Sequence, residues 1–133
     1  MKIAVVGSRR MSAYGREIIG KLMAELKHEE VVTIEVSGCN QEVMRRGAKK
    51  VFKGNDFEKL NEEVANYADK LIVVEGGRQS GTLLLAGKFA EKGKSVYGIV
   101  GRINEENSFA PNWLVAQGAI PIVEIERLTE ILQ

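Results

Sequence analysis

Short apolar runs alternate with amphipathic stretches along the whole chain. The apolar runs are rich in β-branched residues and have the length of buried strands, at residues 3–6, 31–36, 71–74, 95–100 and 120–123. Between them, apolar residues recur at helical spacing and predict helices over 14–27, 41–52, 57–67, 82–91, 112–117 and 127–132. This alternation predicts an α/β fold: a Rossmann-like parallel sheet with helices on both faces, in a single domain over residues 1–133.

Three polar turns follow predicted strands and form the candidate site. Because the carboxyl ends of parallel strands share one edge of the sheet, the turns should face a common crevice, where ligands of such folds bind. Each turn combines glycine with hydroxyl, arginine or carboxylate side chains, which bind or orient phosphate groups. Their residues are Gly7, Ser8, Arg9 and Arg10 in the first turn, Ser37 and Gly38 in the second, and Glu75, Gly76, Gly77, Ser80, Gly81 and Thr82 in the third.

The third turn, in VVEGGRQSGTLLLAGKF over residues 73–89, leads from a buried strand into a helix. Its glycines are expected to adopt positive φ and to let a ligand approach the backbone, while Ser80 and Thr82 add hydroxyl donors. The free N–H groups at the start of the helix carry positive partial charge. An alternative is that the glycines form only a tight turn and a helix cap. The convergence of the three turns favours an anion-binding site.

Composition excludes several classes of protein. The net charge is +1, with an excess of five positive charges in residues 1–53 and of four negative charges in residues 54–133, so this is not a strongly basic protein that coats nucleic acid. One cysteine, Cys39, and one histidine, His28, leave no basis for an intrachain disulfide or a zinc site, and we expect no metal and no cofactor. No apolar run approaches the roughly 18 to 20 residues of a membrane span, so we expect a cytoplasmic protein without a membrane partner.

Common nucleotide motifs are missing. The first turn, GSRRMSAYG, lacks the G-x-G-x-x-G spacing of dinucleotide-binding proteins, and the chain contains no G-x-x-x-x-G-K-[ST] phosphate loop. A single histidine gives no support for a Ser-His-Asp triad. Redox, nucleoside triphosphatase and serine-hydrolase chemistry are therefore disfavoured.

Most of the chain resembles the Rossmann-like core of the DNA-processing protein A (DprA/Smf) family, in the segments VVGSRRMSAYGREI, VVTIEVSG, YADKLIVVEGGRQSGTLLLAGKFAEKGKSVYGIVG and NWLVAQGAIPI. The family's G-S-R turn corresponds to residues 7–9, its S-G turn to 37–38, its E-x-x-x-x-S-G-[ST] motif to 75–82, and its N-x-L-[IL]-x-x-G-A motif to 112–119. The resemblance implies binding of single-stranded DNA by its backbone, a homodimer, and help in loading a RecA-type recombinase.

The chain also departs from that family. Its second turn continues as SGCNQEVMRRGA, without the family's Gly-Ile-Asp, and a short segment replaces the long one that ends in Arg-Asn-Arg. Of that tripeptide only Asn61 keeps its place, with Leu60 and Glu62 where arginines are expected. The resemblance therefore implies a site that includes Asn61 but makes fewer phosphate contacts, which puts full DNA-processing activity and RecA loading in doubt.

A more distant resemblance is to the Lonely Guy-type nucleotide phosphoribohydrolases, whose P-G-G-x-G-T-x-x-E motif is similar around Gly76, Gly77, Gly81 and Thr82. Leu85 stands where that family carries its downstream glutamate, which leaves Glu75 as the candidate acid or as an acceptor that orients loop N–H groups. Three hypotheses follow: a non-enzymatic binder of nucleotide or single-stranded DNA, which we favour, a nucleotide phosphoribohydrolase, and a nucleotide-sensing regulatory or scaffolding domain with a vestigial pocket. Whether the protein is an enzyme stays open.

Overall fold

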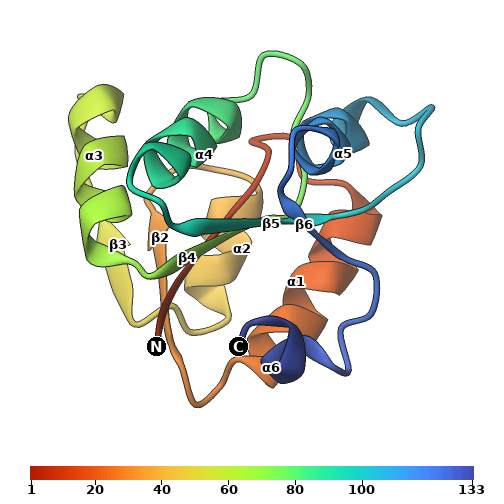
Figure 1. Ribbon diagram of the computed structural model, residues 1–133. Coiled ribbons are helices and arrows are strands. Elements are labelled where there is room, and N and C mark those ends of the chain that lie inside the picture. Colours follow the sequence, from red (N-terminus) through yellow and green to blue (C-terminus); the bar gives the residue numbers. More distant parts are fainter.

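Six parallel strands form one sheet in the order β3-β2-β1-β4-β5-β6 in the computed structural model, which describes residues 1–133 (Figure 1). β1 and β4 are central neighbours, and their chains continue toward opposite edges of the sheet. The crevice beyond their carboxyl ends is therefore the switch point at which ligands of such sheets bind. The strands are β1 (Lys2–Val6), β2 (Glu30–Ile34), β3 (Lys50–Phe52), β4 (Lys70–Val73), β5 (Ser95–Ile99) and β6 (Ile120–Ile122).

Helices cover both faces of this sheet, and Figure 1 shows α3, α4 and α5 above it and α1 and α6 below it. The fold predicted from the sequence is confirmed. None of the helices combines the length and the apolar character needed to cross a membrane. Their bounds are α1 (Ala13–Glu25), α2 (Cys39–Arg45), α3 (Phe57–Tyr67), α4 (Thr82–Glu91), α5 (Phe109–Ala116) and α6 (Leu128–Ile131), with a 3-10 turn, η1, at Glu106–Ser108.

Two apolar cores lie on the two faces of the sheet. On β1, Ile3 and Val5 pack with α1, α2 and α6, whereas Ala4 and Val6 pack with α3, α4 and α5. Successive side chains of a strand point to opposite faces, so a strand covered on both sides is apolar throughout. This is why the central strands appear in the sequence as continuous apolar runs rather than as alternating ones.

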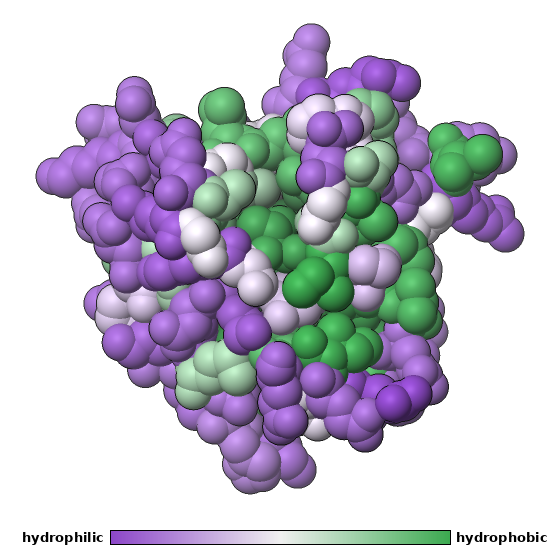
Figure 2. All heavy atoms as spheres, in the orientation of Figure 1, coloured by the Kyte–Doolittle hydropathy of each residue, from purple (hydrophilic) through white to green (hydrophobic).

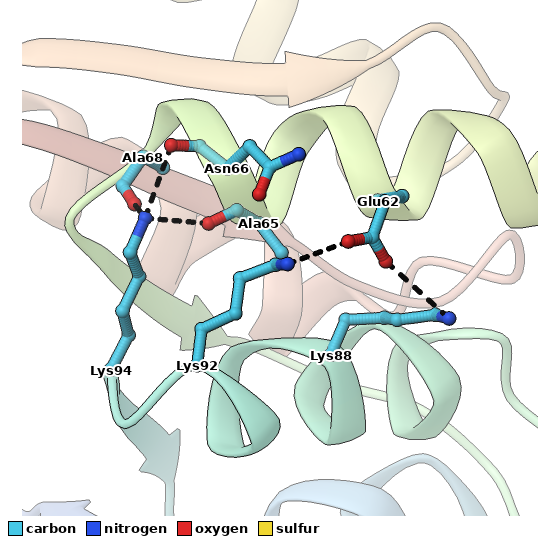
Figure 3. Close-up of polar contacts among 7 residues, drawn as sticks. All are labelled: Glu62, Ala65, Asn66, Ala68, Lys88, Lys92 and Lys94. Atoms are coloured by element: carbon cyan, nitrogen blue, oxygen red, sulfur yellow. Dashed lines mark hydrogen bonds and ion pairs between the residues drawn. The ribbon is translucent and has the colours of Figure 1, made fainter.

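Polar contacts fasten α3 to α4, the two helices that flank the crevice (Figure 3). Glu62 of α3 lies between Lys88 of α4 and Lys92, the residue that follows α4, with Nζ to carboxylate distances of 3.5 and 2.5 Å. Lys94, just after α4, donates hydrogen bonds to three carbonyl groups at the end of α3. Asp56 caps the other end of α3 by accepting the Lys59 N–H at 3.2 Å.

The predicted helix over 41–52 is wrong in its second half. α2 ends at Arg45, Gly47 has a φ of 112°, and residues 50–52 form the edge strand β3 paired with β2. A positive φ at Gly47 ends the helix, since only glycine adopts that conformation without strain. The strand itself is too short for its alternation to stand out from the helical pattern before it. A smaller difference is that α5 begins at Phe109 and includes Pro111, which had been expected in a loop.

Apolar side chains also gather on the surface beside α5 and over the edge of the sheet formed by β6, as Figure 2 shows. Among the exposed apolar residues of this region are Trp113, Ile120 and Val123. β6 pairs only with β5, so its other edge is free.

Candidate phosphate-binding site

The first turn, residues 7–10, is held against the start of α2. The Gly7 N–H donates to Asn40 Oδ1 at 2.9 Å, and the Cys39 N–H donates to the Ser8 carbonyl at 2.9 Å. A Cβ at Gly7 would lie 2.8 Å from Cys39, so the close approach requires glycine. These contacts fix the backbone and leave Arg9 and Arg10 exposed.

The second turn supports the first one from behind. Gly38 has a φ of 82°, and a Cβ there would lie 2.4 Å from the carbonyl oxygens of Ser8 and Arg9. Neither Ser37 nor Gly38 lines the cavity described below. Asn40 does line it, and its amide also donates to the Ile34 carbonyl at 3.0 Å. Gly38 therefore packs against the first turn and does not face the cavity. Asn40, which does line the cavity, was not among the residues predicted for the site.

The third turn enters α4 without positive φ, so that expectation for Gly76, Gly77 and Gly81 is wrong. Gly81, which precedes α4, has an ordinary helical φ of −61°. A Cβ at Gly81 would meet no protein atom within 4 Å, whereas one at Gly76 would lie 2.7 Å from Ser80 Oγ. Gly76 is thus required for packing, and Gly81 leaves open space at the start of the helix.

Backbone donors in this third turn remain available. The N–H groups of Gly77, Gln79 and Gly81 donate to no protein acceptor. The hydroxyl groups of Ser80 and Thr82 share a hydrogen bond of 2.8 Å beside these donors. The first N–H groups of α4 itself are bonded within the turn, Thr82 to Ser80 Oγ at 3.3 Å and Leu83 to the Ser80 carbonyl at 3.2 Å. The donors available to an anion are therefore those of the turn before α4, where the helix dipole adds positive partial charge.

Glu75 points away from this turn and toward the start of α1. Its carboxylate accepts hydrogen bonds from the N–H of Ser12, at 3.0 Å, and from the Ser12 hydroxyl, which also caps α1. Cys39 Sγ lies 3.5 Å from the same carboxylate, and burial together with Glu75 raises the pKa of the Cys39 thiol. Glu75 is buried and does not line the cavity. Its position matches an acceptor that orients the loop between β1 and α1.

The turns meet at a cavity of about 770 Å³ at the carboxyl edge of the sheet. Four of the predicted residues do not line it, namely Ser37, Gly38, Glu75 and Gly76. The cavity brings together the other nine: Gly7, Ser8, Arg9, Arg10, Asn61, Gly77, Ser80, Gly81 and Thr82.

Positive charge dominates the polar wall of this cavity. Arg9, Arg10 and Arg78 line it, and none of them forms an ion pair. The Arg9 guanidinium lies 5.5 Å from the ring centroid of Phe57, and the Arg78 guanidinium lies 4.2 Å from that of Phe109. Such contacts hold a guanidinium over an aromatic face and leave its N–H donors free for a phosphate.

Several lining residues were missed by the sequence analysis. Arg78 and Gln79 lie inside the glycine-containing turn and could have been included on that ground. Glu106 is the one carboxylate in the lining, with Oε1 3.5 Å from the Arg78 N–H. Asn107 accepts the Gly76 N–H at 2.7 Å through its carbonyl and contacts the Arg10 carbonyl through its amide. No pattern in the sequence pointed to Asn107, because these partners are distant along the chain.

The model of the family described as DNA recombination-mediator protein A matches residues 43–133. The chain belongs to this family. Protein Smf of Escherichia coli (strain K12) is 35% identical to it over 78 residues, which cover 59% of this chain and 21% of that relative. DNA processing protein DprA of Bacillus subtilis (strain 168) is 21% identical over 174 residues, covering 98% of this chain and 59% of the relative. The chain thus spans only part of the length of these two curated relatives.

Two solved structures of mediator-family proteins share the fold. DNA processing protein A from Streptococcus pneumoniae superposes with a TM-score of 0.81 at 22% identity, covering 97% of this chain and 61% of that one. DNA processing protein A from Helicobacter pylori, described for its single-stranded DNA binding mode, gives a TM-score of 0.83 at 18% identity, covering 99% and 80%. The resemblance identified from the sequence motifs is confirmed.

Proposed function

We propose that this mediator-family domain binds single-stranded DNA through its phosphates, in the cavity at the carboxyl edge of the sheet. The observation that carries the proposal is the set of arginines without ion-pair partners, Arg9, Arg10 and Arg78, around unpaired backbone N–H groups. Guanidinium groups and helix N-termini are the protein groups best suited to phosphate.

The site has two phosphate-binding walls of different kinds. The first turn supplies positive charge through the exposed side chains of Arg9 and Arg10. The third turn supplies fixed donors through its backbone, with open space at Gly81 for a phosphate oxygen to approach. Phosphate contacts of this type position a nucleic acid without reading its sequence.

A single strand suits this cavity better than a duplex does. A concave cavity of about 770 Å³ has the size of a small-molecule site and can admit a nucleotide of an unpaired strand. In a duplex the bases are stacked and paired inside, so they cannot enter such a cavity without being flipped out. The single-stranded DNA binding of the Helicobacter pylori relative supports the same choice over a free nucleotide.

Hydrolysis of a nucleotide is not part of the proposal. Glu75, the only acid suggested by the sequence, is buried against Ser12 and does not line the cavity. A general acid must reach the bond that it cleaves, directly or through one water molecule. Glu75 supports binding, in our proposal, by orienting the loop that carries Arg9 and Arg10.

The homodimer expected from the family resemblance is part of the proposal, and sedimentation velocity of the purified protein tests it. Its support is the apolar surface along the free edge of β6, which includes Ile120 and Val123 (Figure 2). A second copy that covered these residues would remove apolar area from water. Cooperation with a RecA-type recombinase has the family resemblance as its only support.

Thermal unfolding with and without ligand tests the binding function. A 15-nucleotide single strand present at one hundred times its dissociation constant stabilises the folded state by about 2.7 kcal/mol, which raises the melting temperature measurably. Arg78→Ala should reduce this rise. Arg127→Ala, which removes an exposed arginine of the α6 region, serves as the matched control and should retain it. Equal responses of wild type and Arg78→Ala, or a response only to mononucleotides, would contradict the proposal.

A further inference from the structure

A carboxylate lies in a cavity whose other charged groups suit anions. Glu106 of η1 lines the cavity beside the third turn and is the one carboxylate in the lining. Its Oε1 lies 3.5 Å from the Arg78 nitrogen and would lie 2.9 Å from a Cβ at Gly77. The negative charge of Glu106 is therefore next to the backbone N–H groups that we assign to phosphate.

Backbone contacts of η1 hold Glu106 in this position without using its carboxylate. The Gly76 N–H donates to the Asn107 carbonyl at 2.7 Å, and the Ala110 N–H donates to the Gly76 carbonyl at 2.8 Å. The Asn107 amide also contacts the Arg10 carbonyl, which joins η1 to the first turn. Glu106 is thus presented to the cavity by a segment that is fastened to both phosphate-binding turns.

The carboxylate of Glu106 contributes little to the fold itself. Its one hydrogen bond, from the Arg78 N–H, has a length at which such a bond is weak. Glu106 is exposed and forms no ion pair. The Arg78 guanidinium, which could have neutralised it, lies 4.2 Å from the ring centroid of Phe109 instead. Packing and ion pairing therefore do not account for a carboxylate at this place.

We propose that Glu106 selects phosphodiesters against phosphate monoesters, and so favours the interior of a DNA strand over free nucleotides and 5′-phosphorylated ends. This inference rests on the proposed function, which places a phosphate at the third turn. A phosphodiester carries one negative charge, whereas a monoester carries close to two above its second pKa of about 6. Coulomb repulsion from one fixed carboxylate scales with the charge of the ligand, so it acts about twice as strongly on a monoester.

Repulsion of this kind is a means of specificity. A site discriminates by opposing the wrong ligand as well as by attracting the right one, and an opposing charge is one way to do so. The arginines of the cavity attract both kinds of ester, and they attract the dianion more strongly. Without Glu106, a single phosphate position would therefore prefer a free nucleotide to a link within a strand. Glu106 offsets this preference.

Thymidine 5′-monophosphate and its methyl ester test the inference, because they differ in charge and share the base and the sugar. The quantity measured is the affinity for the monophosphate divided by the affinity for the methyl ester, at about pH 8. Removing one partly exposed charge should change the affinity for a monoanion about threefold, and the affinity for a dianion by that factor squared, roughly tenfold. Glu106→Gln, which keeps the size of the side chain, should therefore raise the ratio about threefold. The amide signals of Gly77 and Arg78 in NMR titrations follow binding at this turn even when it is weak.

Glu105→Gln is the matched control, since it makes the same change one residue away, at an exposed side chain that does not line the cavity. It should leave the ratio as it is in wild type. A ratio that Glu106→Gln leaves unchanged, or that Glu105→Gln raises equally, would overturn the inference. Failure of wild type and of Glu106→Gln to bind either compound would overturn it too, because no phosphate would then lie beside the carboxylate.

A 15-nucleotide thymidine strand without a terminal phosphate tests the proposed function in the same series of titrations. If wild type binds this strand while the ratio does not respond to Glu106→Gln, only the inference fails. If the ratio responds as expected but the strand does not bind, the proposed function fails and the selection of diesters by Glu106 stands.

Discussion

Replacing Lys94 by methionine should destabilise the fold while leaving ligand binding intact. The Lys94 Nζ donates to the carbonyl oxygens of Ala65 at 2.6 Å, Asn66 at 3.2 Å and Ala68 at 2.7 Å (Figure 3). These groups lie at the carboxyl end of α3, where helix carbonyls have no partner within the helix. A cation at this position also interacts favourably with the helix dipole.

The expected cost follows from these contacts. A hydrogen bond to a charged group contributes about 1.5 to 3 kcal/mol. The helix dipole adds roughly 0.3 to 1 kcal/mol. Because the three bonds share one ammonium group and some carbonyls regain water, the terms do not add, and we expect a loss of about 2 kcal/mol. Methionine keeps the apolar stem, so the change reports the ammonium group rather than lost packing.

Lys92→Met provides the matched comparison from the same surface. It removes one of the two ion pairs of Glu62, between side chains that are 27% and 43% exposed, and Lys88 remains as a partner. Exposed pairs contribute roughly 0 to 1 kcal/mol. Urea unfolding followed by circular dichroism measures both free energies. A cost of Lys94→Met no larger than that of Lys92→Met would refute the capping role of Lys94, and a loss of oligonucleotide binding would show that the cap also supports the cavity.

Three further changes test the site and its support. Gly81→Val should fold with nearly wild-type stability, since a Cβ there meets no protein atom, yet lower oligonucleotide affinity at least tenfold, and unchanged affinity by anisotropy would remove this turn from the site. Glu75→Ala should weaken binding because it frees Ser12 and the first turn, whereas Glu75→Gln keeps an acceptor for the Ser12 N–H and should bind better than the alanine variant; the reverse order would contradict the orienting role. Hydrogen bonds from Arg45 lower the pKa of Glu42 to about 2 in the folded state, below its value in the unfolded chain. The stabilisation from Glu42 should therefore be present above pH 4.5 and lost as the pH falls toward 2. Unfolding measured over that range should show a loss on the order of 1 kcal/mol that is absent in Glu42→Gln, and an equal loss in the variant would assign it to other groups.

The sequence predicts a strand where burial on both faces makes it a continuous apolar run, and a helix where a capping residue or a turn marks its start. The helices Phe57–Tyr67 and Thr82–Glu91 were predicted with the bounds that the structure gives them, the first preceded by the cap Asp56 and the second by a glycine-containing turn. β3 was not predicted, because an edge strand of three residues has only one neighbour and little apolar pattern of its own. Its existence depends on pairing with β2, which is a tertiary contact.

The residues of the candidate site also fall into two groups, those that the sequence predicts and those that only tertiary contacts bring to the cavity. The strand-end turns were located by a rule of topology, which places Gly7, Arg9 and Gly81 at one cavity. The rule does not say which residues face the ligand and which pack behind it, and Gly38 proved to lie behind the first turn. Asn107 enters the site from the segment after β5 through long-range hydrogen bonds, and such contacts leave no periodic trace in the sequence.

Salt dependence of oligonucleotide binding tests the phosphate-binding account most directly. If the domain contacts about three or four phosphates, the logarithm of affinity should fall with the logarithm of salt concentration with a slope of roughly −2 to −3. Arg9→Ala should make the slope shallower by roughly 0.7 and weaken binding equally for two unrelated sequences. The measurement is fluorescence anisotropy of wild type and variant between low and physiological salt. Absence of binding at low salt, or a slope that Arg9→Ala leaves unchanged, would contradict the assignment of this cavity to the DNA backbone.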